Sequence, residues 1–200
     1  MGIPVNKMTP DYIEGLVESY SFSQPVGSTL TVCTLVLTNG CVVVGTSNVI
    51  DPANYDGVLG QSAALANTKG KLYELEGYAL KRERTALINK AAEAAHEANR
   101  EYCRSLGDHS QPRWSEALNW QKDSAIKGVE TIMRNPNTQP HEGHEAWLNH
   151  KVQDGWVYGT EKCEVRKTHP CIVLYGDLPE AQREKDEIFI ETVREVLGFE

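Results

Sequence analysis

The sequence predicts an α+β fold, with an N-terminal β-hairpin flanked by helices and a mainly helical C-terminal part. Two β-rich runs, TLTVCTLVL and CVVVG, lie on either side of Asn39-Gly40, a dipeptide typical of a tight hairpin turn. A run rich in Ala, Glu and Lys then extends from residue 72 to about residue 102 and predicts a long helix. The turn-rich stretch GDHSQPR follows it, so we expect one domain over 1–106 and a second over 107–200.

The remaining N-terminal elements are predicted from caps and spacing. Thr9-Pro10 is typical of a helix start, and the apolar residues after it, Ile13, Leu16, Val17 and Tyr20, recur at helical intervals. The continuous run at 42–44 predicts a strand buried on both faces. Asp51-Pro52 predicts another helix start, and the polar stretch 67–70 predicts the end of that helix.

The C-terminal half is predicted to contain three helices and one irregular segment. Ser115 is the expected cap of the first helix, and a second helix is expected from about His141 to Gln153, where Gly155 stops it. The region 156–175 reads as extended or loop. The final helix is expected to open near Glu180, because apolar residues follow with helical spacing at positions 189, 193 and 196.

Composition and charge exclude several classes of protein. The formal net charge is -8, which disfavours duplex nucleic acid as a partner, because phosphate contacts dominate that affinity. No run of about 18 apolar residues is present, so we expect no membrane contact. The five cysteines are scattered, as in a reduced cytoplasmic protein, and neither a metal nor a cofactor is expected.

The segment 144–175, HEAWLNHKVQDGWVYGTEKCEVRKTHPCIVLY, concentrates aromatic and basic side chains in this acidic chain. Trp156 and Tyr158 could stack on a planar group. Cations nearby could neutralise phosphate. These are Lys151, Arg166, Lys167 and His169. The alternative is that Trp147 and Trp156 are core residues and the lysines are solvated.

The sequence gives less support to a catalytic or metal-binding site than to a ligand site in this aromatic and basic segment. Cys163, His169 and Cys171 do not have the paired spacing of a zinc site. On a helix, His141, His144 and Glu145 would share a face, but this is not an HExxH pattern and suits a solvated helix start. An acid/base role for His144 or His169 stays open, although no nucleophile or carboxylate pair accompanies them in the sequence. We therefore predict no catalytic residues.

The C-terminal residues resemble the RyR repeat domain over about 110–197. The matching features are the tryptophan of HEAW, GWVYG, KTHP, VLY, LP and the KD pair. The resemblance implies a ligand-binding module linked to adenine nucleotides and ADP-ribose-type signals. It implies these binding positions: Trp147, Trp156, Tyr158, Lys167, His169, Tyr175 and Lys185. Cys163, Glu164 and Leu174 depart from the pattern and affect the expected shape of the loop.

The N-terminal residues from about 25 to 85, with TVCTLVLTNGCVVVG and LYELEGYALK, are similar to a family of small tailed-phage proteins of "gene product forty-nine" type. Together the two resemblances imply a phage protein in the host bacterial cytoplasm. We expect a non-catalytic protein that sequesters a nucleotide-derived immune signal, cyclic ADP-ribose-like or a cyclic oligonucleotide, and so counters antiphage defence. The alternatives are an enzyme that degrades such a signal and a protein–protein module that inactivates a host factor. We also expect a homo-oligomer, with the helix at 72–102 as its interface.

Overall fold

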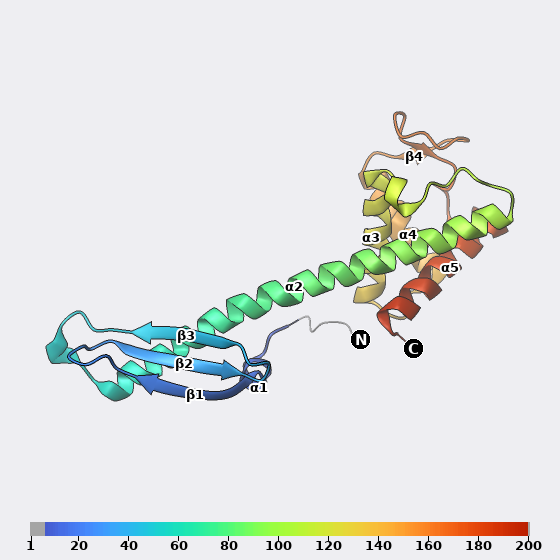
Figure 1. The fold of residues 1–200 in the computed structure, drawn as a ribbon. Coiled ribbons are helices and arrows are strands. Elements are labelled where there is room, and N and C mark those ends of the chain that lie inside the picture. The colour runs from blue at the N-terminus through green and yellow to red at the C-terminus, as the bar shows by residue number, and fades with distance from the viewer. Residues whose placement is uncertain (1–6, 200) are drawn as a thin grey trace. The chain divides into compact units, whose positions relative to one another are not determined.

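A computed structural model of the chain describes residues 7–199 (Figure 1). The chain forms two compact units that divide between Glu83 and Arg84. Helix α2 (Gly57–Ser105) contributes its first part to one unit and its second part to the other. The long helix expected at 72–102 lies within it, and the boundary expected at 106/107 follows the end of α2. The first six residues of the expected N-terminal domain lie outside the described range.

The N-terminal unit is built on a three-stranded antiparallel sheet in the order β1-β2-β3 (Figure 1). The elements are α1 (Pro10–Gly15), β1 (Val17–Ser23), β2 (Thr31–Leu37), β3 (Val42–Ser47) and the short helix η1 (Pro52–Asn54). The hairpin predicted at Asn39-Gly40 is confirmed: the pair joins β2 to β3, and Gly40 has φ +83, a region that favours glycine.

The first helix is shorter than predicted. Thr9 caps α1 as expected, since its Oγ1 accepts a hydrogen bond from the Tyr12 N–H. The helix ends at Gly15, however, and Val17 and Tyr20 lie in strand β1. In VESYSFS the serines alternate with larger residues, and this period of two decides in favour of a strand.

One face of the sheet packs against the first part of α2. Strand β2 alternates between buried and half-buried residues, and the buried set includes Cys33 and Leu35. The prediction that 42–44 is buried on both faces is wrong: Val43 is buried, whereas Val42 and Val44 are 57% and 44% exposed. Helix α2 covers only one face, so every second valine of β3 is left exposed.

The prediction of a helix end at 67–70 is also wrong, because the polar residues there bind the sheet. The Asn67 side chain donates to the Thr46 carbonyl, and Lys71 Nζ donates to the Val44 carbonyl. Thr68 lies against Gly45, where a Cβ would come within 2.3 Å of Thr68 Oγ1 and 2.7 Å of its backbone nitrogen. The helix therefore continues and approaches β3 closely at this glycine.

The C-terminal unit is mainly helical, as predicted. It contains the second part of α2, η2 (Trp114–Glu116), α3 (Asn119–Arg134), α4 (Pro140–Gln153), β4 (Val157–Tyr158), β5 (Thr168–His169), η3 (Tyr175–Asp177) and α5 (Glu180–Leu197). Ser115 lies in η2 and does not cap α3, which begins four residues later. At the start of α3, the Gln121 side chain accepts a hydrogen bond from the Leu118 N–H. Gly155, with φ +82, follows α4 as predicted.

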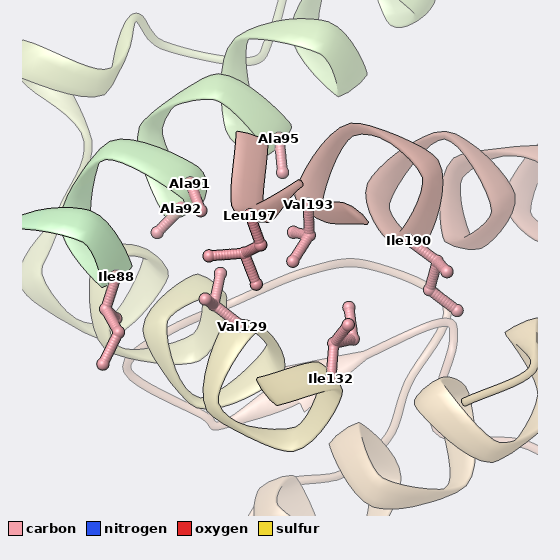
Figure 2. Close-up of a cluster of buried hydrophobic side chains, with 9 residues drawn as sticks. All are labelled: Ile88, Ala91, Ala92, Ala95, Val129, Ile132, Ile190, Val193 and Leu197. Atoms are coloured by element: carbon pink, nitrogen blue, oxygen red, sulfur yellow. The ribbon is translucent and has the colours of Figure 1, made fainter. Parts of the chain in front are cut away.

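The core of this unit joins α2, α3 and α5 (Figure 2). Small residues on α2 let the other helices approach, and larger aliphatic side chains from α3 and α5 fill the space between them. The buried cluster consists of Ile88, Ala91, Ala92, Ala95, Val129, Ile132, Ile190, Val193 and Leu197. Gly128 on α3 has the same effect, because a Cβ there would lie 2.8 Å from the Phe189 ring. No helix in the described range is both long enough and apolar enough to cross a membrane.

Candidate functional site

The C-terminal unit contains a cavity of about 720 Å³. Its walls come from the C-terminal part of α2, from α3, α4 and α5, and from the irregular segment between α4 and α5. A cavity of this size falls in the usual range of small-molecule sites. Five of the eight predicted binding residues line it: Trp147, Lys151, Trp156, His169 and Lys185.

An aromatic cluster forms one part of the cavity wall. The rings of Trp120 and Trp156 are 5.0 Å apart between centroids. His169 contacts the edges of Trp147 and Trp156, with centroid separations of 5.1 and 6.4 Å. Trp156 is only 5% exposed, as the core alternative expected, whereas Trp147 is half-buried. The two tryptophans of the predicted segment therefore differ in how much surface they offer.

Lys151 is the most unusual side chain of the cavity. It is 4% exposed, and its Nζ lies 4.7 Å from the Trp120 ring centroid and 5.0 Å from that of Trp156. Burial lowers the pKa of Lys151 to about 8, since it penalises the charged form; Lys162 lowers this pKa further and Asp154 opposes the shift. The two indole faces stabilise the ammonium in place of water.

Lys162 and Lys185 also line the cavity. Lys162 Nζ lies 4.7 Å from the same Trp120 centroid. The residue as a whole is exposed, but its ammonium is buried, and this burial lowers the pKa of Lys162. The positive charge of Lys185 lowers this pKa further. Among the described residues, Lys151, Lys162 and Lys185 have no carboxylate within ion-pair distance. Three lysines without ion pairs thus face one space in an acidic chain.

Four buried polar atoms of residues in the wall lack a hydrogen-bond partner among the described residues. They are the donors Trp120 Nε1 and Arg100 Nε and the acceptors Asn99 Oδ1 and Asp186 Oδ2. Most buried polar atoms in proteins are hydrogen-bonded, so an unpaired donor and an unpaired acceptor in a cavity wall point to a ligand with polar groups.

The two histidines of the cavity have different settings. His144 is 3% exposed, its Nε2 lies 2.9 Å from the Val173 carbonyl, and its Nδ1 lies 3.6 Å from Asp186 Oδ2. Burial acts to lower the pKa of His144, but the contacts with Asp186 and Val173 outweigh it and raise the pKa. Burial and the neighbouring lysines lower the pKa of His169 to about 4, and its Nδ1 accepts a hydrogen bond from the Cys171 N–H.

The other three predicted residues lie outside the cavity lining. Tyr158 is exposed on β4. Tyr175 packs beside His144, with ring centroids 5.8 Å apart. Lys167 has a left-handed backbone, φ +49, and its Nζ donates to the Asp154 carbonyl at 2.5 Å, which fastens the loop to the end of α4.

The remaining residues singled out from the sequence lie in or after the segment between β4 and β5. Cys163 and Thr168 exchange two backbone hydrogen bonds and close a turn around Glu164. Arg166 pairs with Glu161 at 3.6 Å and does not line the cavity. Leu174 is exposed. Within residues 7–199, no group of three or more His, Cys, Asp and Glu side chains is arranged to hold a metal ion.

Sequence reasoning missed Trp120 and Lys162. Trp120 lies at the start of α3, 31 residues before Lys151 in the sequence, and only the packing of α3 against α4 brings the two together. Lys162 was unremarkable because it is one exposed lysine in the irregular segment between β4 and β5. No local signal in the sequence links Trp120 to Lys151, because they meet only through the packing of separate helices.

Two family models match separate parts of the chain. Residues 8–84 match the phage protein family described as "Phage protein (N4 Gp49/phage Sf6 gene 66) family". This match covers almost the same residues as the N-terminal compact unit, which ends at Glu83.

The C-terminal unit has its own match. Residues 130–199 match the RyR domain. The RyR match begins within α3 and contains three of the lysines that line the cavity, Lys151, Lys162 and Lys185. Trp120 and the α2 residues of the cavity wall precede it. Both resemblances expected from the sequence are therefore confirmed, and the cavity combines RyR residues with residues outside the match.

Proposed function

We propose that this phage protein binds and sequesters a small, nucleotide-derived anion in the cavity of its C-terminal unit. The observation that carries the proposal is the trio Lys151, Lys162 and Lys185, which face the cavity without carboxylate partners among the described residues. Removing an ammonium from water is costly unless another charge compensates it. A phosphate or diphosphate supplies such a charge and binds Lys well.

The aromatic residues have separate roles in this proposal. The ammonium of Lys151 already occupies the ring faces of Trp120 and Trp156, so these indoles hold the phosphate-binding cation. Trp147 is less buried and lines the same cavity, and it is the residue that stacks on a base. Loss of one base–aromatic contact of this kind costs about 1–3 kcal/mol. Trp120 Nε1 and Asn99 Oδ1 would bind polar groups of the ligand.

The proposed biological role is that of a sponge. The ligand would be a cyclic ADP-ribose-like molecule or a cyclic oligonucleotide made as an immune signal in the host cytoplasm, and its removal would counter antiphage defence. The similarity of the N-terminal part to a phage protein family and the RyR match of the C-terminal part support this role. A homo-oligomer joined through α2 remains part of the proposal.

Binding is favoured over catalysis by the state of the two histidines. Both ring nitrogens of His144 face protein acceptors, so the ring has no free position for a substrate. His169 has a pKa of about 4, which makes it a weak base at neutral pH. The contacts of His144 favour a structural role for it. The low pKa of His169 keeps its ring uncharged at neutral pH.

The test is recovery of the bound molecule. The protein is incubated with ADP-ribose, its cyclic isomers, cyclic di- and trinucleotides, ATP and NAD, then desalted, denatured and extracted for mass spectrometry. A sponge returns one compound intact and in stoichiometric amount. Recovery of a cleaved product would establish the degrading enzyme instead. If no compound is retained and a host protein copurifies in stoichiometric amount, the protein–protein alternative holds.

A further inference from the structure

Lys151 has the surroundings of a reactive amine. Its Nζ lies over the indole rings of both Trp120 and Trp156, at 4.7 and 5.0 Å from their centroids, and the residue is 4% exposed. The second ammonium, from Lys162, lies at 4.7 Å from the same Trp120 ring. Burial and a neighbouring cation both lower the pKa of a lysine amine and so enlarge its neutral, nucleophilic fraction.

Burial is the largest cause of the lowered pKa of Lys151, and the charges around the amine act in both directions. Lys162 and Lys127 disfavour its protonated form, and Asp154 and Asp123 oppose them. The Lys127 ammonium and an Asp154 carboxylate oxygen lie 3.8 Å apart, so their opposite effects on the pKa of Lys151 partly cancel. Burial, together with these charges, lowers the pKa of Lys151 to about 8, which makes the neutral amine about two orders of magnitude more abundant at pH 7.5 than for an ordinary lysine.

We propose that Lys151 condenses with the carbonyl group of a small anionic aldehyde or ketone held in the cavity. The Nζ lone pair forms a bond to the carbonyl carbon, and the carbonyl π pair moves to oxygen, which takes up a proton while Nζ releases one to give a carbinolamine. The hydroxyl then leaves as water with a second proton, which Nζ also releases, and an imine forms between Nζ and the former carbonyl carbon. One water is released, and no oxidant or reductant is required.

The anionic part of the ligand would lie against the other lysines. Lys162 and Lys185 line the same cavity and have no ion-pair partner in the described part of the chain. A phosphorylated sugar in its open-chain form has both groups, a carbonyl for Lys151 and a phosphate for these two cations. This reactivity needs only the cavity and is independent of the sponge role.

The test uses pyridoxal 5′-phosphate, an anionic aldehyde, followed by borohydride to fix the imine and by peptide mapping. At pH 7.5 and a low ratio of probe to protein, Lys151 is expected to be modified at least ten-fold faster than the exposed Lys90. Unphosphorylated pyridoxal should lose most of this preference. The rate at Lys151 should rise with pH and level off above pH 8.

Variants separate the amine from the pocket. Lys151→Met should remove the fast phase and Lys90→Met should leave it unchanged, while circular dichroism checks that each variant is folded. Lys162→Met keeps the Lys151 amine but removes the adjacent cation, and should slow the fast phase about ten-fold. Modification of Lys151 no faster than Lys90 in the folded wild-type protein would overturn the proposal. That result would leave reversible nucleotide binding intact, since a thermal shift measures it without any covalent step.

Discussion

The ammonium nitrogen of Lys151 lies 4.7 Å from the centre of the Trp120 ring, although the two residues come from different helices. Lys162 places a second ammonium at the same distance from that ring. Two cations beside one indole, with no carboxylate within ion-pair distance of either in the described chain, are unfavourable in the empty protein. An anionic ligand relieves this repulsion, so stability and ligand binding should oppose one another at this site.

Replacement of Lys151 by methionine should therefore stabilise the unliganded protein and abolish binding. Methionine keeps the length and the contacts of the side chain with the two indoles but has no charge to bury. We expect the free energy of unfolding to rise by roughly 1–3 kcal/mol at pH 7. Chemical denaturation measures the gain, and Lys90→Met is the control on an exposed lysine of α2.

The same replacement should change the dependence on pH. The pKa of Lys151 is lowered to about 8 in the folded chain from an ordinary value of 10.5, so the unfolded chain binds the extra proton between these values. Wild-type stability should therefore gain a rising component from pH 8 to about 10.5, and Lys151→Met should lack it. The charges that face this amine are Asp123, Lys127, Asp154, Lys162, Lys185 and His169. An equal slope in both proteins over this range would contradict the assigned burial.

His144 should act as a structural residue. His144→Ala leaves the Val173 carbonyl without its donor and removes the imidazole that lies 3.6 Å from Asp186 Oδ2, so we expect a loss of roughly 2–4 kcal/mol in the free energy of unfolding. Asp186→Asn keeps an acceptor for Nδ1 and should cost less. Because the folded pKa of His144 is raised, the contribution of this pair is fully present below pH 6.5 and is lost as pH rises through the folded value. A folded, stable His144→Ala variant would contradict this role.

His169 should make the protein sensitive to acid. Its pKa is lowered to about 4 from 6.5, so the unfolded chain binds a proton between these values and stability falls as pH decreases from 6.5 to 4. The loss should reach roughly 2–3 kcal/mol. His169→Asn retains an acceptor in place of Nδ1 for the Cys171 N–H and should flatten this part of the profile. Denaturant unfolding at several pH values compares the two slopes, and unchanged acid sensitivity in the variant would assign it to other groups.

Two glycines of the N-terminal unit should respond oppositely to alanine. A Cβ at Gly45 would collide with the backbone nitrogen and hydroxyl of Thr68, so Gly45→Ala should destabilise the unit by about 1–3 kcal/mol. Gly70 lies in α2 with nothing within 4 Å of a Cβ, and Gly70→Ala should stabilise the helix by roughly 0.5–1 kcal/mol. Thermal unfolding measures both. A stabilising effect at Gly45 would contradict the close approach of α2 to β3.

Local signals in the sequence were sufficient where one segment determines its own structure. The Asn39-Gly40 turn, the Thr9 cap and the helix ending at Gln153 depend on nearby residues, and all three are present. Strand β1 was missed because Val17 and Tyr20 fit a helical period as well as an alternating one. The polar residues at 67–70 are typical of a helix end, whereas in the structure the sheet provides their partners and the helix continues.

The candidate site could be predicted only in part, because its residues meet through contacts between separate segments of the chain. Trp147, Lys151, Trp156, His169 and Lys185 were expected near a ligand and do line the cavity. Trp120 could not be found in the same way, since nothing local links it to Lys151. Lys167 lies in the segment in which the sequence places the site, but its Nζ donates to the Asp154 carbonyl and the residue does not line the cavity.

The most direct test of the central claim is a thermal-shift titration of the wild-type protein and three variants with ADP-ribose, its cyclic isomers, cyclic di- and trinucleotides, ATP and NAD. A ligand at a hundred times its Kd should add about 2.7 kcal/mol of stability to the wild type. The account predicts that one ligand gives this shift, that Lys151→Met and Lys162→Met lose it, and that Lys167→Ala keeps it. Absence of a shift with every compound, or a shift that survives in both Lys151→Met and Lys162→Met, would contradict the assignment of this cavity as the binding site.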